Sequence, residues 1–374
     1  MTRLTAAQRL KFVLLAEGLT IDPRASEVLD EHAGGRALTP ADYASTSGLI
    51  LALEDHVWVN APISRYNPNF VDQPETALVH DGTTFRVQGR DLASKAEVWL
   101  PPRYHRQQQV EGRPIEHFVF THGDRVRLSP IRGCAMKCRF CNIPYEDPYE
   151  TKPPTAMVSS LRHAFDDPLQ PAHHALISGG TPVERDFGYL QQVYRDVLIA
   201  FPEYDIDIMM VPVDGLLDVE ELRDLGVGEL SINLELSDGE RARELMPQKH
   251  RYGWDRYLGF IEHATSVLGP GRVRSMVMAG LEPLEQTLAG VERIIEHGGV
   301  PVLSPFRPDP ATPLADLRPL DASELEETYL AAAEIAAAAG VGLGPSCVVC
   351  THNTLTFVPS NGTASYRYPR PVLV

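Results

Sequence analysis

Short apolar segments alternate with longer amphipathic ones from Arg125 onward, and this alternation limits what the chain can fold into. The short segments are rich in β-branched residues, as buried strands are, and the longer ones repeat apolar residues at helical spacing. Strands that alternate with helices pair in parallel, so we predict an α/β fold whose six βα units form an open (β/α)6 barrel. The predicted strands are Val126–Pro130, Ala175–Ser178, Asp205–Val211, Glu229–Leu236, Val273–Ala279 and Val302–Phe306.

A predicted helix follows each of these strands. The helix after the fourth strand has an apolar stripe between Trp254 and Leu268, which we assign to the core. Asp321 and Glu324 have the spacing of a capping box, so they indicate the start of the last, Ala-rich helix. The other predicted helices are Thr155–Phe165, Tyr189–Phe201, Val219–Leu225 and Leu284–Glu296.

Residues 1–122 lie outside this repeat. Leu10–Leu19 and Ala25–His32 have helical patterns, and Ala77–Val87, interrupted at Asp81-Gly82, is typical of a β-hairpin. We therefore divide the chain into a small N-terminal α+β accessory domain (1–122), the barrel (123–340) and a C-terminal tail (341–374). The accessory domain either closes the open side of the barrel or recruits substrate, and the sequence leaves both roles open.

Three cysteines, Cys134, Cys138 and Cys141, come directly after the first predicted strand. Their C-x3-C-x2-C spacing allows three thiolates to hold three irons of a 4Fe-4S cluster, which leaves the fourth iron open to another ligand. A structural zinc site needs a fourth ligand, which this loop lacks nearby. Disulfides are disfavoured, because the chain starts without an apolar signal stretch and has only 5 cysteines in 374 residues.

The cysteine spacing, with the aromatic Phe140 before the last cysteine, resembles the signature of the radical S-adenosylmethionine (SAM) superfamily. The resemblance covers residues 125 to 350. It implies a partial (β/α)6 barrel, a 4Fe-4S cluster on the three cysteines, and SAM bound at the open iron near Phe140. A reductant such as flavodoxin or ferredoxin would supply the electron that cleaves SAM to a 5'-deoxyadenosyl radical. Because such barrels place their chemistry at the carboxyl ends of the strands, the position of the cysteine loop agrees with the motif.

The second predicted strand ends in Gly179-Gly180-Thr181. A double glycine lets the backbone approach a ligand closely, although the same pair can be a simple tight turn. The stretch is similar to the superfamily's Gly-Gly-Glu or Gly-Gly-Thr-Pro segment, which binds the amino group of SAM. The resemblance therefore implies that these residues bind the cofactor, with Thr181 in the place of the glutamate.

Polar residues alternate along the fourth predicted strand at Ser231, Asn233, Glu235 and Ser237. Side chains two residues apart share one face of a strand, so these would project together. Helices cover the outside of a parallel barrel, so we expect this face to point inward. Buried polar groups need partners, and the ribose and amino acid end of SAM would supply them.

The fifth predicted strand runs into Gly280 and resembles the superfamily's adenine-binding strand. Arg274 has the same inward parity as Met276 and Met278. We predict that its guanidinium pairs with the carboxylate of SAM or with a substrate anion. Arg307, which follows the sixth strand, is a second candidate for this role.

The remaining cysteines, Cys347 and Cys350, form a C-x2-C-x-H string with His352. Three interpretations stay open: an auxiliary iron-sulfur cluster completed by His352, the substrate or another residue; a redox-active dithiol; or a structural turn. An auxiliary cluster would suit the biotin synthase and lipoyl synthase branch of the superfamily, in which a second cluster donates sulfur. Those enzymes hold that cluster with more recognisable ligands than this sequence shows.

Charge and hydropathy limit the partners. The chain has 34 Lys+Arg and 50 Asp+Glu, a formal net charge of −16, which disfavours nucleic acid and anionic membranes. No apolar run approaches the roughly 18 residues that span a bilayer. We therefore predict a cytoplasmic radical SAM enzyme that abstracts hydrogen from a small molecule or peptide. Its reaction would belong to cofactor or natural-product biosynthesis, by sulfur insertion, rearrangement or carbon–carbon bond formation. The alternative is a non-catalytic iron-sulfur or zinc-binding scaffold.

Overall fold

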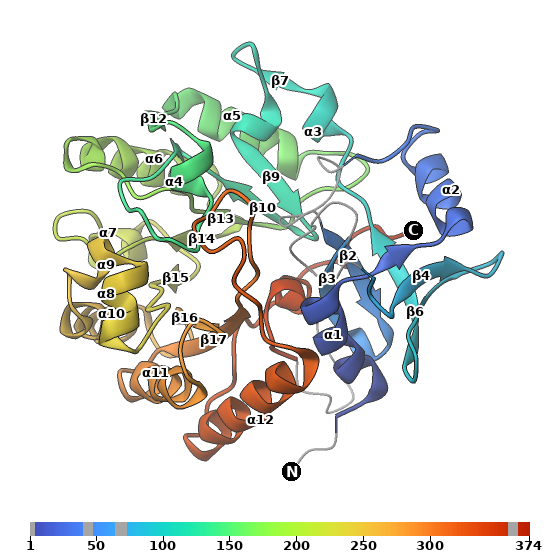
Figure 1. Cartoon of the computed structure of the whole chain (residues 1–374). Coiled ribbons are helices and arrows are strands. Elements are labelled where there is room, and N and C mark those ends of the chain that lie inside the picture. The colour runs from blue at the N-terminus through green and yellow to red at the C-terminus, as the bar shows by residue number, and fades with distance from the viewer. Residues whose placement is uncertain (1–3, 40–47, 64–72, 358–365) are drawn as a thin grey trace.

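The computed structural model describes residues 4–39, 48–63, 73–357 and 366–374. A curled sheet dominates the C-terminal two thirds of the chain, and helices cover its outer face (Figure 1). Its strand order among the described residues is β17-β16-β15-β14-β13-β10-β9, in which only the β9–β10 pair is antiparallel. The strands are β9 (Val119–His122), β10 (Arg125–Leu128), β13 (His174–Ile177), β14 (Asp205–Met209), β15 (Leu230–Ser231), β16 (Val273–Ala279) and β17 (Val300–Pro305).

The six parallel strands confirm the predicted open (β/α)6 barrel. The covering helices are α5 (Pro154–Phe165), α6 (Phe187–Ala200), α7 (Val219–Asp224), α10 (Trp254–Leu268), α11 (Leu284–Glu296) and α12 (Ala322–Ala338). The four helices whose bounds were predicted, α5, α6, α7 and α11, lie within two residues of those bounds, and α12 begins at the predicted capping box of Asp321 and Glu324. Apolar residues on the outer side of the strands, including Val126, Ile177 and Ile208, are buried in the main core.

The interior side of the barrel is less tightly packed than the outer side. Along β16, Ser275 and Val277 are buried, whereas Met276 and Met278 remain partly exposed. Because side chains alternate between the two faces of a strand, Met276 and Met278 line the inside of the barrel.

The fourth strand is much shorter than predicted. Only Leu230–Ser231 pair as β15, followed by an isolated bridge between Glu235 and Val277. Glu235 has φ 67°, in the left-handed region that non-glycine residues rarely occupy, so the two-residue alternation breaks at this position. Two short helices that the sequence pattern did not indicate, α8 (Gly239–Leu245) and α9 (Pro247–His250), precede α10.

A second sheet, with strand order β1-β4-β5-β6-β2-β3, belongs to the N-terminal part. Its strands are β1 (Thr20–Ile21), β2 (Gly48–Leu53), β3 (Trp58–Pro62), β4 (Ala77–His80), β5 (Phe85–Gln88) and β6 (Ala93–Trp99). The antiparallel β4–β5 pair confirms the predicted hairpin. Helices α1 (Ala6–Glu17) and α2 (Pro23–His32) confirm the two predicted N-terminal helices, and α1 packs between α12 and β3 at the side of the barrel (Figure 1).

Short elements connect the two parts: α3 (Tyr104–Gln107), β7 (Gln109–Val110) and β8 (Arg113–Pro114). Three others, β11 (Ile131–Arg132), α4 (Ile143–Glu146) and β12 (Glu150–Thr151), lie within the barrel part, between β10 and α5. The ammonium of Lys11, on α1, donates to the carbonyl oxygens of Thr351 and Thr356, each at 2.9 Å. This buried lysine therefore ties the first helix to the C-terminal segment. No helix in the described ranges has the length and apolar character that a membrane crossing requires.

Candidate functional site

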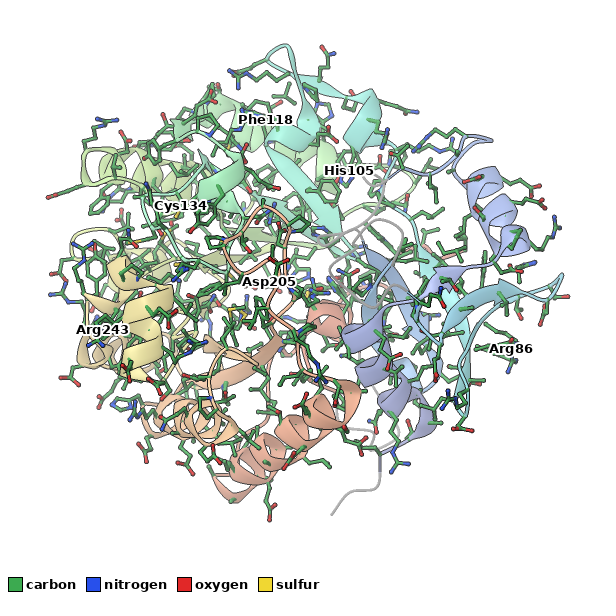
Figure 2. All side chains as sticks on the ribbon, in the orientation of Figure 1. Arg86, His105, Phe118, Cys134, Asp205 and Arg243 are labelled. Carbon is green, nitrogen blue, oxygen red and sulfur yellow. The ribbon has the colours of Figure 1, made fainter. Side chains whose placement is uncertain are left out.

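The cysteine loop lies where the first barrel strand ends, after β10 and β11 (Figure 2, Cys134). All three cysteines are free thiols; Cys138 is buried and the other two are half-buried. Burial raises the pKa of Cys138 to about 12 and that of Cys141 to about 11. Metal binding deprotonates such thiols, because a bound cation stabilises the thiolate far more than a dry protein interior does.

The three loop sulfurs do not converge on one point. Ligands of a single ion lie within about 4 Å of one another, given metal–ligand bonds of about 2.0–2.3 Å. Among the described residues, the group of His, Cys, Asp and Glu side chains whose ligand atoms all lie within 4.8 Å of one another contains none of the three loop cysteines. The loop therefore does not suit a mononuclear zinc site. A cluster that binds each thiolate to a different iron needs this wider spacing.

Backbone amides face the first cysteine. The N–H of Met136 donates to Cys134 Sγ at 3.3 Å, and the N–H of Thr181 donates to the same sulfur at 3.2 Å. Hydrogen bonds from amides stabilise a thiolate and tune the potential of a cluster that it holds. The Cys134 environment thus suits a charged, metal-bound sulfur.

The structure brings Gly179, Gly180 and Thr181 directly against this loop. The N–H of Ala135 donates to the carbonyl oxygen of Thr181 at 2.9 Å. A Cβ atom on Gly180 would lie 1.6 Å from the carbonyl oxygen of Gly133, so only glycine permits this approach. Gly179 has φ 129°. The double glycine therefore packs the end of β13 onto the cysteine loop.

Ser231 and Asn233 are both buried, and their side chains are hydrogen-bonded to each other. The Ser231 hydroxyl donates to Asn233 Oδ1 at 2.8 Å, and the N–H of Met276 donates to the same oxygen at 3.3 Å. Ser237 turns elsewhere, because its hydroxyl accepts from Arg293 on α11 at 3.1 Å. The predicted common face thus includes Ser231 and Asn233 and ends before Ser237.

Glu235 forms a buried ion pair with Lys249, a residue of α9 that sequence reasoning missed. The Lys249 Nζ to Glu235 Oε2 distance is 2.7 Å, and the charges of both residues act on Cys138. Burial lowers the pKa of Lys249, but Glu235 and Cys138 outweigh that effect and raise it above its usual value. No periodic pattern marks Lys249, because only the fold brings α9 to this point.

Arg274 does not join these residues. Its guanidinium pairs with Asp207, at 3.0 Å, and with Glu229; Arg274 and Asp207 are buried, and the Glu229 side chain is 12% exposed. Arg274 is the second residue of β16, so it lies at the amino end of the strand, away from the cysteine loop. We therefore no longer assign it to the carboxylate of SAM. Gly280 has φ 101°, and a Cβ added to it would meet Leu320 and Phe306 rather than the cysteine loop, so the structure shows a turn there.

Two other arginines lie on or just after barrel strands, Arg127 on β10 and Arg307 after β17. Arg127, on the inward side of β10, keeps an exposed side chain, and no carboxylate pairs with it among the described residues. Although solvent reaches its side chain, the surrounding barrel wall partly desolvates the guanidinium and lowers the pKa of Arg127, and the Cys141 thiol acts in the opposite direction. Arg307 donates to Asn353 Oδ1 at 2.8 Å, and burial lowers its pKa to about 10. Sequence analysis named Arg307 and overlooked Arg127, although the parity of β10 could have indicated it.

Cys347 and Cys350 lie beside Asp124 and His174, at the amino ends of β10 and β13. His352, the predicted additional ligand, points its Nδ1–H at the carbonyl oxygen of Val349, at 2.7 Å. The structure therefore replaces His352 with Asp124 and His174 as the neighbours of this cysteine pair.

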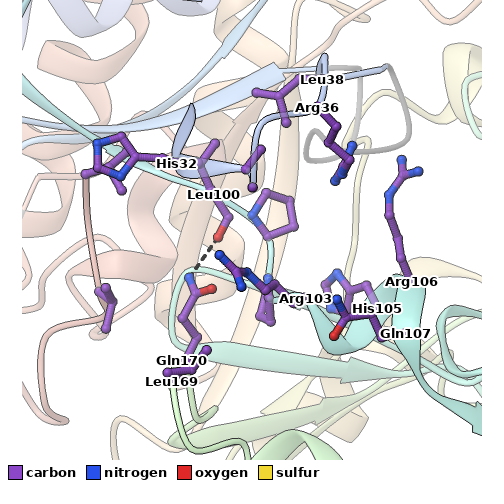
Figure 3. A pocket seen from close by; sticks show the side chains of 16 residues that line it. His32, Arg36, Leu38, Leu100, Arg103, His105, Arg106, Gln107, Leu169 and Gln170 are labelled. Atoms are coloured by element: carbon purple, nitrogen blue, oxygen red, sulfur yellow. Dashed lines mark hydrogen bonds between the residues drawn. The ribbon is translucent and has the colours of Figure 1, made fainter. Parts of the chain in front are cut away.

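A separate cavity of about 520 Å³ lies between the end of α2 with the residues that follow it and the segment from Leu100 to Gln107, which includes α3 (Figure 3). Gln170 crosses it to donate to the carbonyl oxygen of Leu100 at 2.8 Å. Three arginines, Arg36, Arg103 and Arg106, line this cavity. It lies apart from the cysteine loop, as the positions of His105 and Cys134 show (Figure 2).

Residues 128–299 match the family model described as the Radical SAM superfamily. This segment contains the cysteine loop, the double glycine and the strands β13 to β16. The fold and the loop thus define a domain of the radical SAM class. The chain carries a radical SAM domain, which confirms the family predicted from its cysteines.

Relatives with known names were also found. Bacteriochlorophyllide c C-7(1)-hydroxylase of Chlorobaculum limnaeum is 27% identical over 139 residues, which make up 37% of this chain and 34% of that protein. The chain therefore matches about a third of this relative's length. SuiB of Streptococcus suis, bound to SAM, has a TM-score of 0.47 and 17% identity, covering 63% of this chain and 53% of that one. A radical SAM methyltransferase from Sphaerobacter thermophilus has a TM-score of 0.47 and 15% identity, covering 73% and 77%.

Proposed function

We propose that this chain is an enzyme that cleaves SAM reductively and abstracts hydrogen from a substrate inside its barrel. The observation that carries the proposal is the packing of Gly179–Thr181 onto a loop of three thiols at the carboxyl ends of the strands. Cys134, Cys138 and Cys141 would hold a 4Fe-4S cluster. When bound, the cluster would supply one electron to SAM, which then yields methionine and a 5'-deoxyadenosyl radical.

The chain's own residues would prepare this site. The amides of Met136 and Thr181 hold the Cys134 sulfur in place, and Gly180 removes the side chain that would otherwise separate the two segments. The Lys249–Glu235 pair adds a buried cation and anion next to Cys138. Glu235 also has a left-handed backbone, and strain of this kind is often found at functional sites.

Ser231 and Asn233 are the best candidates to bind SAM from the fourth strand. Their oxygen and nitrogen atoms lie inside the barrel next to Met276, on the strand that resembles the adenine-binding strand. A buried amide can exchange its present partners for a ligand that offers both donors and acceptors. Phe140, half-buried beside the last cysteine, packs against the core and is a candidate to contact SAM from the loop.

The barrel interior favours a small molecule or a peptide segment as substrate. Met276 and Met278 supply flexible apolar surface, and Arg127 supplies a cation without a protein partner in the described chain. The bacteriochlorophyllide hydroxylase named above has a small-molecule substrate by its name, which supports the small-molecule alternative. We place the reaction in cofactor or natural-product biosynthesis in the cytoplasm, with flavodoxin or ferredoxin as the reductant.

The test is anaerobic reconstitution with iron and sulfide, followed by addition of SAM and dithionite. We expect about four irons bound by the loop and formation of 5'-deoxyadenosine. The matched control carries alanine at Cys134, Cys138 and Cys141 and should make none. If the reconstituted wild-type protein binds four irons but forms no more 5'-deoxyadenosine than this control, the chain is an iron-sulfur scaffold and not a radical SAM enzyme.

A further inference from the structure

A second group of metal-ligating side chains lies at the opposite end of the barrel strands from the cysteine loop. Asp124 directly precedes β10, His174 is the first residue of β13, and Cys347 and Cys350 come from the C-terminal segment. All four are buried, and one ligand atom from each lies within 4.8 Å of the others. We propose that these four residues bind a single zinc ion, which fastens the C-terminal segment to the barrel.

The distances suit a tetrahedron. Zinc bonds of about 2.3 Å to sulfur and about 2.0–2.2 Å to nitrogen or oxygen give edges of about 3.6 Å from sulfur to nitrogen or oxygen. The same bond lengths give an edge of about 3.4 Å between nitrogen and oxygen. Cys350 Sγ lies 3.5 Å and Cys347 Sγ 3.8 Å from His174 Nε2. Cys347 Sγ lies 3.8 Å from both carboxylate oxygens of Asp124, and His174 Nε2 lies 3.4 Å from Asp124 Oδ1.

The same dimensions argue against an iron-sulfur cluster here. A cluster binds each protein ligand to a different iron and therefore holds the ligands farther apart than a single ion does. The space that Cys347, Cys350 and His174 border has a volume of about 10 Å³, about that of one water molecule. Two thiolates, an imidazole and a carboxylate are all ligands that zinc accepts, and four protein ligands around one ion close a tetrahedral site as structural zinc sites do.

Without an ion, this group of side chains is only partly matched. His174 can donate to the buried Asp124 carboxylate, at a long 3.4 Å, and the other two neighbours in this group are thiols, which donate weakly. With a divalent ion, two thiolates and the carboxylate leave one net negative charge. Arg125 borders the same space and can balance that charge, whereas Arg274, which also borders it, is already paired with Asp207 and Glu229.

Surrounding contacts already hold the ligands in place, as expected around a metal. The N–H of Cys350 donates to Cys347 Sγ at 3.4 Å. The imidazole of His174 stacks on Tyr368, with ring centroids 4.4 Å apart and an interplanar angle of 22°. The Tyr368 hydroxyl donates to Asp205 Oδ2 at 2.7 Å, so the last residues of the chain cover the site.

The site connects parts of the chain that are far apart in sequence. Asp124 and Cys347 are separated by 223 positions, and His174 and Cys350 by 176. An ion bound to all four would add its binding free energy to the folding of the barrel and tail. Because the protein fills all four positions, the ion would have a structural role and leave no open site for a substrate.

The test measures zinc and iron per chain by mass spectrometry in the anaerobically purified full-length protein. We expect one zinc in the wild type and in the variant with alanine at Cys134, Cys138 and Cys141, which loses the iron. The Cys347→Ser/Cys350→Ser double variant should show the reverse, with zinc lost and loop iron kept. This reciprocal pattern separates the zinc site from the proposed radical SAM function, since either can fail without the other.

Cobalt provides a readout that does not depend on the double variant's folding. Wild-type protein loaded with cobalt(II) should show the visible ligand-field bands of a tetrahedral site and thiolate-to-cobalt charge transfer. Asp124→Asn keeps the side-chain shape but removes a charged ligand, and should weaken zinc at least ~10-fold in competition with a chelator. Wild-type protein without zinc, zinc retained by the double variant, or iron lost from it in place of zinc would each overturn the proposal.

Discussion

Replacing Gly180 by alanine should disrupt the cysteine loop while leaving the barrel folded. The new Cβ would lie 1.6 Å from the carbonyl oxygen of Gly133 and 2.9 Å from the Cα of Cys134. Non-bonded carbon and oxygen atoms approach to about 3.0 Å, so one of the two segments must move by about 1.4 Å. Overpacking of this kind costs about 1–3 kcal/mol. A displacement of about 1 Å at a reacting centre can lower a rate about 100-fold.

The assay compares iron content and 5'-deoxyadenosine formation in Gly180→Ala and wild type after identical reconstitution. Gly259→Ala is the matched control, because Gly259 lies within α10 and its added Cβ would meet no atom within 4 Å. In a helix this control should be neutral or stabilising by up to about 1 kcal/mol. The reasoning is refuted if Gly180→Ala binds wild-type iron and forms 5'-deoxyadenosine within about twofold of the wild-type rate.

Three further outcomes can be checked. Cys138→Ala should abolish 5'-deoxyadenosine formation while the circular dichroism spectrum stays near that of the wild type, because the barrel core does not depend on the loop; an unfolded variant would contradict the cluster assignment. Asn233→Ala should weaken SAM binding by about 1–3 kcal/mol in equilibrium titrations with iron content unchanged, and wild-type affinity would remove Asn233 from the SAM site. Burial lowers the pKa of His105 to about 3, with a smaller contribution from Arg106. In the unfolded chain the histidine pKa is about 6.5. Between about pH 3 and 6.5 this residue therefore binds more protons in the unfolded chain than in the folded one, so the free energy of unfolding falls as the pH drops through that range. Between pH 7.5 and 5.5 the loss from this residue is about 1.4 kcal/mol. His105→Gln, which keeps an acceptor for the N–H of Thr121, should show a correspondingly shallower dependence in urea unfolding, and an unchanged pH slope would contradict the assignment.

Local patterns were sufficient to predict most of the barrel. Helix α11 has the predicted bounds, because its apolar residues repeat at helical spacing and Gly298-Gly299 ends it. The capping box at Asp321 predicted the start of α12 for a similar local reason. The fourth strand was predicted too long, since polar alternation persisted in the sequence beyond Ser231 while the backbone turned at Glu235. A positive φ at a glutamate leaves no mark in a hydropathy pattern.

The candidate site shows what periodicity can and cannot specify. Two-residue alternation predicts which face of the strand Arg274 is on, and the structure agrees, but alternation does not say whether a residue lies near the amino or the carboxyl end of the barrel. Arg274 proved to be near the amino end, where Asp207 and Glu229 neutralise it. The contact of Lys249 with Glu235 and the meeting of Asp124 with Cys347 depend on tertiary folding, so no local motif indicates them.

The two metal-ligating groups lie at opposite ends of the same strands, and this separation bears on the chemistry. Strand β10 alone spans 4 residues, or about 13 Å at about 3.3 Å per residue, between Asp124 at one end and the segment leading to the cysteine loop at the other. A sulfur atom from the Cys347–Cys350 pair would have to cross the barrel interior past Arg127 to reach a radical formed at the loop. A zinc ion bound there would also hold no sulfide to give. With all five cysteines then assigned, three to the loop and two to zinc, sulfur insertion has no donor cluster within the chain. The proposed hydrogen abstraction is therefore better matched to reactions that need no protein-derived sulfur, such as rearrangement or carbon–carbon bond formation.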